Sequence, residues 1–296
     1  MKLKKSTADL LLIVVTLLWG SGFVATKIAI DNNAPTGMIN LIRGGIFALL
    51  CYVFYFKKIN SITKEEIKKG FVAGSLNSLA YVLQTVSLHY TTVSNSAFLT
   101  ASNVLIVPFI VWIFHNKRPT LKVFVSVAVC LSGMAALTGF LSSSVTLNWG
   151  DALALLGAIM FAFSLTYISN NAKDIDFSII AFMLGLTQAI GGLFYFIVFD
   201  GGEVGGINWT GALLPLLYMG VFPSFVSQTL QVVAQQNTTA TSAALIMTLE
   251  AVFGSVFSIL FGYEKLTWSL AAGGGLILLS IIISEINIRK KDILIE

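Results

Sequence analysis

Long apolar runs recur along the whole chain, and short polar segments separate them. Each run is about 20 residues long, which is the length that a helix needs to cross the hydrocarbon core of a bilayer. Apolar residues make up 56% of the chain and charged residues 11%, whereas a soluble domain carries about 25% charged residues. So small a polar content cannot cover a surface that faces water. The sequence therefore predicts an all-α protein embedded in a membrane.

Ten of these runs are predicted to be transmembrane helices. The first follows a short basic segment, as in a secretory signal, but nine more runs follow it, which favours an uncleaved first span. None of the connections is long enough to fold into a soluble domain. The predicted spans are residues 9–30, 35–56, 70–88, 93–114, 121–140, 149–168, 177–199, 209–234, 239–262 and 268–287.

Lysine and arginine residues gather on one side of the predicted membrane. Such loops stay in the cytoplasm, and an even number of spans places both termini on the same side. Lys265 lies on the other side, whereas Lys27 and Arg43 fall within predicted spans. We therefore expect cytoplasmic termini and a multi-pass protein of the cell membrane (inner or plasma membrane). The basic residues of the predicted cytoplasmic side are Lys2, Lys4, Lys5, Lys57, Lys58, Lys64, Lys68, Lys69, Lys117, Arg118, Lys122, Lys173, Arg289, Lys290 and Lys291.

The chain contains a weak internal repeat, seen when the sequence is slid along itself. One register places Asp9, at the head of the first span, on Asp151, at the head of the sixth; we call it the aspartate register. Each half has five predicted spans, so the second half enters the membrane upside down. Two inverted five-helix repeats, residues 9–140 and 149–287, are typical of secondary transporters, which bind substrate near the midplane between the halves.

A second register, close to the first, places Gln84 on Gln231; we call it the glutamine register. Without gaps it matches further identical residues in the two halves. These pairs are Leu83 with Leu230, Thr91-Thr92 with Thr238-Thr239, Ala97 with Ala244, Phe114 with Phe261 and Thr120 with Thr267.

Two predicted helices carry polar stripes at equivalent positions of the two halves. Side chains three or four residues apart share one face of a helix, and the glutamine register superimposes the stripes. They are either the wall of a polar substrate cavity or hydrogen-bonding contacts between helices, each worth roughly 0.6 kcal/mol. Their symmetric placement favours the cavity. The stripes are Asn77, Tyr81 and Gln84 in the third span, and Ser224, Gln228, Gln231 and Gln235 in the eighth.

Glu250 lies near the middle of the ninth predicted span. An ionised carboxylate at that depth costs at least a few kcal/mol, so it is expected to be paired, protonated or exposed to water. It could bind a substrate ammonium group or a proton, or it could form a structural ion pair with Arg43 or Lys27. Lys27 is near enough to the end of its span to extend to the interface. Arg43 lies deeper, where anchoring or pairing is the favoured role.

Aromatic side chains occur on the first and sixth spans, namely Trp19, Phe163 and Tyr167. The aspartate register matches Trp19 with Phe161. Such rings could stack on a planar substrate. The alternative is ordinary packing, because an apolar bundle uses many large side chains.

The sequence argues against an enzyme, a metal site or a bound cofactor. The two histidines, His89 and His115, end consecutive spans on opposite faces of the membrane, and no HExxH or GxSxG motif occurs. Cys51 and Cys130 lie inside apolar runs without metal-ligand spacing, so both are interpreted as packing residues. Glycine pairs such as Gly44-Gly45 and Gly191-Gly192, together with Gly273-Gly274-Gly275 and the segment from Gly70 to Gly74, favour close approach of helices.

Several segments resemble the EamA-type transporters of the drug/metabolite transporter superfamily, over essentially the whole chain. The resemblance implies the two-repeat fold and the transport of a small metabolite, since the family handles amino acids, nucleosides, sugars and other compounds. The family usually has proline after the glutamate of the ninth span, where this chain has Ala251; Pro108 and Pro223 are expected to break the fourth and eighth spans. The matching segments are Trp19-Gly20-Ser21-Gly22-Phe23 with Lys27, Arg43, Tyr90-Thr91-Thr92 to Phe98, Leu249-Glu250-Ala251-Val252-Phe253 and Gly262-Tyr263-Glu264-Lys265-Leu266-Thr267.

The function expected from the repeat and the resemblance is secondary transport of a small polar metabolite, an amino acid or a related compound, by alternating access. Export is the favoured direction, protons are the candidate coupling ion, and a monomer is expected. The alternatives are an importer and a lipid-headgroup carrier (flippase), which would need a groove open to lipid. The net charge of +4 is explained by the basic loops and requires no nucleic-acid partner.

Overall fold

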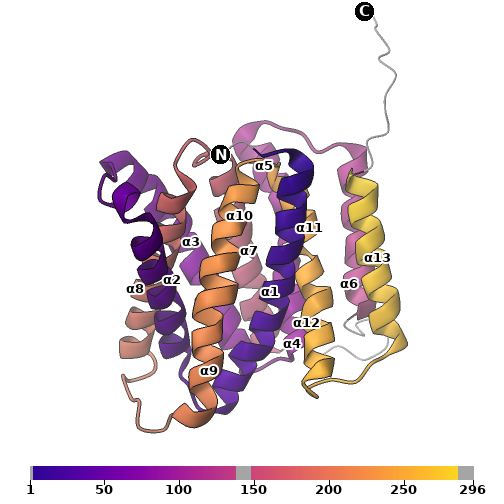
Figure 1. Cartoon of the computed structure of the whole chain (residues 1–296). Helices are drawn as coiled ribbons and strands as arrows, with labels where there is room; N and C mark the ends of the chain where they lie inside the picture. Colours follow the sequence, from indigo (N-terminus) through magenta and orange to yellow (C-terminus); the bar gives the residue numbers. More distant parts are fainter. Residues whose placement is uncertain (1–2, 138–147, 286–296) are drawn as a thin grey trace, which may run out of the picture.

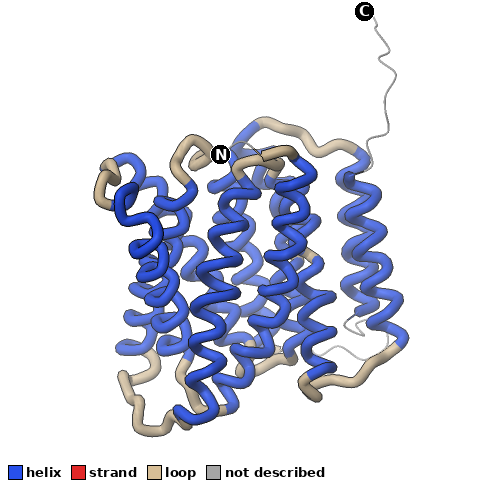
Figure 2. The backbone as a smooth tube through the Cα atoms, viewed as in Figure 1, coloured by secondary structure: helices blue, strands red, loops and turns tan. Residues whose placement is uncertain are grey.

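The computed structural model describes residues 3–137 and 148–285, and these form helices joined by short connections (Figure 2). No strand occurs within these two ranges. The ends of the predicted spans and repeats at residues 140 and 287 lie outside the described residues. The same holds for Lys2, Ser143, Arg289, Lys290 and Lys291.

The described helices run up and down in one bundle (Figure 1). The first half comprises α1 (Lys5–Asp31), α2 (Thr36–Ile59), α3 (Lys64–Ser87), α4 (Val93–Ala101), α5 (Asn103–His115) and α6 (Leu121–Leu137). The second half comprises α7 (Trp149–Asn170), α8 (Phe177–Val198), α9 (Trp209–Met219), the π-helix η1 (Gly220–Val226), α10 (Ser227–Gln235), α11 (Ala240–Met247), α12 (Leu249–Leu260) and α13 (Trp268–Glu285).

Within residues 3–137 and 148–285, seven helical segments are long and apolar enough to cross a membrane. Two shorter apolar helices lie within α6 and α13. Helix α3 is not among the seven, because polar side chains such as Asn77 and Gln84 make even its charge-free part, residues 70–87, less apolar than the other spans. The seven are Lys5–Asp31, Thr36–Ile59, Val93–His115, Trp149–Asn170, Phe177–Val198, Trp209–Gln235 and Ala240–Leu260.

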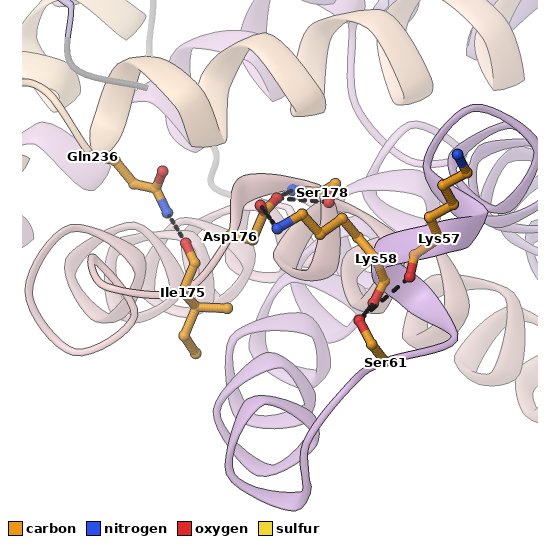
Figure 3. A network of polar contacts seen from close by, with 7 residues as sticks. All are labelled: Lys57, Lys58, Ser61, Ile175, Asp176, Ser178 and Gln236. Carbon is orange, nitrogen blue, oxygen red and sulfur yellow. Dashed lines mark hydrogen bonds and ion pairs between the residues drawn. The ribbon is translucent and has the colours of Figure 1, made fainter.

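One end of the bundle holds the start of α1 and the turns that follow α2, α5, α7 and α10; we call it the basic end. Polar contacts tie its turns together (Figure 3). Lys58 Nζ lies 3.5 Å from Asp176 Oδ2, and Asp176 also accepts hydrogen bonds from the backbone and hydroxyl groups of Ser178. Gln236 Nε2 donates to the carbonyl oxygen of Ile175 at 2.8 Å. The far end of the bundle, which we call the opposite end, holds the turns after α1, α3, α8 and α12.

The two halves pack most closely where α2 meets α8. A Cβ atom on Gly44 would lie 2.3 Å from the backbone nitrogen of Ala189, and one on Gly192 would lie 2.3 Å from that of Leu41. Only glycine permits so close an approach at these two positions, as the glycine pairs predicted. Helices α6 and α13 form a separate pair at one edge of the bundle (Figure 1).

Two spans are broken at equivalent places in the two halves. Helix α4 gives way to α5 at Ser102, and α11 gives way to α12 at Thr248. Ser102 Oγ donates to the carbonyl of Leu99 at 2.5 Å, and Thr248 Oγ1 donates to that of Leu245 at 2.6 Å. Hydroxyl groups make the same kind of bond inside continuous helices, as Thr16 and Ser21 do in α1, so these bonds accompany the breaks without explaining them.

The prediction that proline breaks these helices is correct in one place and wrong in another. Pro223 lies inside η1, so the eighth predicted span contains a π-helical segment around a proline. Pro108 lies within the continuous helix α5, and the break in that span occurs earlier, at Ser102. The ninth span is broken at Thr248 although Ala251 replaces the usual proline.

Candidate functional site

A small cavity of about 20 Å³ lies between the two halves. That volume has room for about one water molecule, so the walls are drawn together around their polar side chains. Helices of both halves contribute. The lining residues are Trp19, Gly22, Phe23, Thr26, Arg43, Asn77, Tyr81, Gln84, Thr100, Asn103, Phe161, Ser164, Leu165, Pro223, Gln231, Met247 and Glu250.

Most of the side chains proposed from sequence meet at this cavity: Trp19, Arg43, Asn77, Tyr81, Gln84, Gln231 and Glu250. Two others stand directly behind its wall. Ser224 Oγ accepts a hydrogen bond from Arg43 Nε at 3.3 Å, and Gln228 Oε1 accepts one from Asn77 Nδ2 at 2.9 Å. The third-span and eighth-span stripes therefore contact each other and also border the cavity.

Tyr167 and Lys27 lie elsewhere. Tyr167 borders a second hollow between α5 and α7, together with Phe163, whose ring packs edge-on against Phe114 at 6.2 Å. Lys27 Nζ lies 3.2 Å from Asp31 Oδ1, one helical turn away near the opposite end. Neither side chain lines the central cavity.

Arg43 is held against an aromatic ring on the cavity wall. Its guanidinium lies 4.6 Å from the ring centroid of Tyr81, and 3% of its surface is exposed. The Tyr81 ring in turn meets Phe161 edge-on at 5.0 Å. A guanidinium stacked on an aromatic ring keeps its positive charge without a carboxylate partner.

Glu250 lies in the first turn of α12, and 4% of its surface is exposed. Within residues 3–137 and 148–285 its carboxylate forms no ion pair and no side-chain hydrogen bond. The pair with Arg43 or Lys27 considered above is thus absent from this structure: Arg43 bonds Ser224, and Lys27 pairs with Asp31. The positive end of the α12 dipole favours the carboxylate in this turn.

Trp19 is fixed by a contact between the halves. Its indole Nε1 donates to the carbonyl oxygen of Pro223 in η1 at 3.0 Å. The next residue, Gly20, lies against α12, where an added Cβ would sit 2.7 Å from the backbone nitrogen of Gly254. Helix α1 thus brings Trp19 to the cavity and packs against the helix that carries Glu250.

Among the lining side chains that sequence reasoning missed are Thr100, Asn103, Phe161 and Ser164. Two were open to detection by the internal repeat. The glutamine register places Asn103 on Glu250, and the aspartate register places Trp19 on Phe161. The other two carry no such signal. Ser164 bonds the carbonyl of Ala73, and Thr100 accepts from Gln84 Nε2 at 3.3 Å.

A second polar group lies at the opposite end. His89 Nε2 lies 3.1 Å from Thr36 Oγ1, and Asp200 Oδ2 accepts from the backbone nitrogen of Gly37 at 2.7 Å, at the start of α2. Burial lowers the pKa of His89, and the positive charge of Lys27 lowers it further. Burial raises the pKa of Asp200. Both groups are therefore biased towards their neutral forms.

Known proteins resemble this chain along almost its whole length. An "uncharacterized transporter" of Archaeoglobus fulgidus is 32% identical over 289 residues, covering 96% of this chain and 88% of that protein. The "uncharacterized transporter YvbV" of Bacillus subtilis is 24% identical over 297 residues, covering 98% and 94%. One crystal structure matches with a TM-score of 0.76 at 14% identity, over 95% of this chain and 96% of that one, which shows a shared fold.

The model of the EamA-like transporter family matches twice, at residues 6–139 and 148–285. Members of the family are transporters and not enzymes, and several apolar helices fit a multi-pass protein of the cell membrane. The sequence resemblance is thus confirmed, and this chain belongs to the EamA-like transporter family.

Proposed function

We propose that this protein is a secondary transporter that exports a small polar metabolite, an amino acid or a related compound, by alternating access. The observation that carries the proposal is the separation of two opposite charges on one cavity. Arg43 and Glu250 both line it, and neither neutralises the other. A molecule with an anionic and a cationic end would satisfy both groups at once.

The proposed architecture has ten spans in two inverted repeats, residues 9–140 and 149–287, with both termini in the cytoplasm. The charge-free part of α3, residues 70–88, would supply a further span, and the polar side chains that line the cavity are the reason that it is less apolar than the others. The described lysines and arginines of the connections support this orientation. They lie mainly at the basic end, with Lys265 at the opposite end.

Contacts that the halves make at both ends of the bundle support the proposal of alternating access. Thr238 Oγ1 donates to Asp9 Oδ1 at the basic end, and Thr91 Oγ1 donates to Asp151 Oδ1 at the opposite end. Opening one end while keeping the other closed would expose the cavity to one side at a time. Glu250 could take a proton when the cavity holds no substrate, which makes protons the candidate coupling ion.

A lipid-headgroup carrier is the second candidate, because an apolar groove of about 430 Å³ runs between α3 and α8. Its walls include Phe71, Leu79 and Phe194, with Ser75, Ser78 and Thr187 as polar members. The groove shares no lining residue with the central cavity. A flippase would need a polar path beside the acyl chains, so the separation of the two spaces favours the soluble substrate.

Transport by proteoliposomes tests the proposal. Vesicles containing the purified protein and loaded with a mixture of radiolabelled amino acids should release label faster than protein-free vesicles. Release should fall steeply in the Glu250→Gln variant, whereas Glu203→Gln, in the connection after α8, serves as a matched control. Movement of a fluorescent phospholipid between leaflets, without amino-acid release, would favour the lipid carrier instead.

A further inference from the structure

Two residues from opposite halves occupy equivalent positions beside the helix breaks. Asn103 directly follows the break at Ser102, and Glu250 lies two residues after the break at Thr248. The glutamine register superimposes Asn103 on Glu250. Both side chains line the central cavity. The pseudosymmetry of the fold therefore brings an amide of one half and a carboxylate of the other to one site.

The polar side chains of the cavity divide into those with a partner and those without. Tyr81 lies under the Arg43 guanidinium, and Thr100 accepts from Gln84. Each of the following also contacts a named group: Trp19, Thr26, Arg43, Asn77 and Ser164. Three remain in the described part of the chain: Asn103 and Gln231, whose amide oxygens accept no hydrogen bond, and Glu250, whose carboxylate meets no described donor.

These three side chains are as buried as the core. Asn103 and Glu250 are 4% exposed and Gln231 is 5% exposed. Asn103 Oδ1 and Gln231 Oε1 accept no hydrogen bond within the described ranges. A buried polar group without a partner costs about 1–3 kcal/mol, and more when it is charged. Three such groups on one small cavity indicate a place prepared for a ligand rather than a structural contact.

We propose that Asn103, Gln231 and Glu250 form one subsite for the protonated amino group of the transported molecule. A primary ammonium has three N–H donors and no acceptor, and the subsite offers a carboxylate and two amide oxygens. The carboxylate repels an anionic group, which is left to Arg43 on the same cavity. This assignment rests on the proposed function and names the chemistry that the substrate presents to the second half.

Binding to the purified protein tests the subsite. The probes are three matched mixtures at equal concentration: amino acids, the same amino acids N-acetylated, and the amines that decarboxylation would give. Wild-type protein should gain thermal stability with the amino acids and with the amines, and should gain none with the N-acetyl series. Equal stabilisation by the N-acetyl series would overturn the assignment. So would equal stabilisation by sodium chloride added to a choline buffer, because the site would then bind a sodium ion and not an amino group.

Variants then test whether the two halves share one ligand group. Glu250→Gln and Asn103→Leu should weaken binding of the amino-acid mixture by about 10- to 100-fold, the range for a lost hydrogen bond to a charged group. The double variant Asn103→Asp/Glu250→Gln moves the carboxylate to the equivalent position of the other half. It should recover most of the affinity lost in Glu250→Gln. Glu203→Gln, which removes an exposed carboxylate in the connection after α8, is the control.

The outcomes separate the subsite from the transporter. A double variant that binds as weakly as Glu250→Gln shows that the two positions do not serve one group, and overturns the proposal. Should Glu250→Gln fail to fold, Asn103→Asp alone decides: tighter binding of the amine mixture supports the subsite, and unchanged binding overturns it. Release of N-acetyl amino acids from vesicles would support the proposed transport function but would overturn the proposed ammonium subsite. A wild-type protein that binds and moves none of the mixtures rejects both.

Discussion

Thr91 donates a 2.7 Å hydrogen bond to Asp151 where α3 and α4 meet the start of α7. Thr238 makes the equivalent bond to Asp9, at 3.3 Å, where α10 and α11 meet the start of α1. The glutamine register superimposes the two threonines, and the aspartate register superimposes the two aspartates. Each bond joins one half of the chain to the other, and the two bonds lie at opposite ends of the bundle.

Removing one of these hydroxyl groups should favour opening of the corresponding end. With Cys51 and Cys130 replaced, Ser164→Cys places a thiol on the cavity. In this background, Thr91→Val should raise the rate at which a reagent added outside labels the cysteine at position 164 by several-fold. Thr238→Val should raise the rate of labelling from the cytoplasmic side by a smaller factor. The difference follows from the longer bond at Asp9, which also pairs with Lys5 at 3.2 Å. Equal labelling in both variants and the parent would show that neither bond holds the bundle closed.

The proposed orientation predicts which loops a membrane-impermeant reagent reaches in intact cells. Single cysteines at Asn32 and Ser143 should be labelled from outside, whereas those at Lys64 and Asn171 should react only after the membrane is permeabilised. Asn32 shares hydrogen bonds with Asn208 at the opposite end, and Ser143 lies outside the described residues. Labelling of a cysteine at Lys64 from outside intact cells would contradict the proposed orientation.

Gln84 and Gln231 should respond differently to alanine, although both line the cavity. Gln84 bonds Thr100, so its loss should cost about 1 kcal/mol of stability in addition to transport. Gln231 has no side-chain hydrogen bond within the described residues, so Gln231→Ala should lower transport with little change in melting temperature. Amino-acid release and thermal unfolding, measured on the same preparations, distinguish the two. Normal transport in both variants would show that the polar stripes of the third and eighth spans have a structural role and do not bind substrate.

The structure also predicts that Arg43 and Glu250 behave as independent sites. Glu250→Gln removes a buried charge that has no partner among the described residues, so thermal stability should stay the same or rise while transport falls. Arg43→Gln should lose stability, because its guanidinium contacts Tyr81 and Ser224. The double variant should show the sum of the two changes. Recovery of stability in the double variant would instead indicate an ion pair in another conformation.

Acid should destabilise the protein partly through His89. Its folded pKa lies below the ordinary value near 6.5, chiefly because of burial and then because of Lys27, while Asp200 and Asp31 act in the other direction. The unfolded state therefore takes up the proton first, and the contribution is present above pH 6.5 and is lost as the pH falls through the folded pKa. Thermal unfolding of His89→Asn should depend less on pH than the wild type between about pH 7.5 and 5.5. An identical pH dependence would exclude this role.

Much of the fold was predictable because hydropathy and charge report directly on a helix in lipid. The apolar runs matched helices to within a few residues at most boundaries, since each run ends where polar turns begin. The breaks at Ser102 and Thr248 were not predictable in this way. Ser102 and Thr248 bond back to carbonyl groups as serine and threonine also do inside the continuous helix α1, so their residue types do not mark a break, whereas Pro108 offered a stronger but misleading signal.

The site was predictable as far as charge and symmetry reach. Glu250 and Arg43 stood out because ionisable groups are rare in spans, and the matched stripes pointed to Gln84 and Gln231. Asn103 is neutral, and only its equivalence to Glu250 could have singled it out. The choice of Tyr167 over Phe161 reflects helix rotation, which apolar residues on every face of α7 leave undetermined.

The seam between α2 and α8 also limits how this sequence can vary. At Gly44 a single added methyl group would meet the backbone of the facing helix, so any larger residue would force the two halves apart. Its neighbour Gly45 has no atom within 4 Å of the place where a Cβ would stand. The two adjacent glycines therefore differ in what they tolerate, although their hydropathy is equal. Functional variants should keep glycine at position 44 and should accept many other residues at position 45.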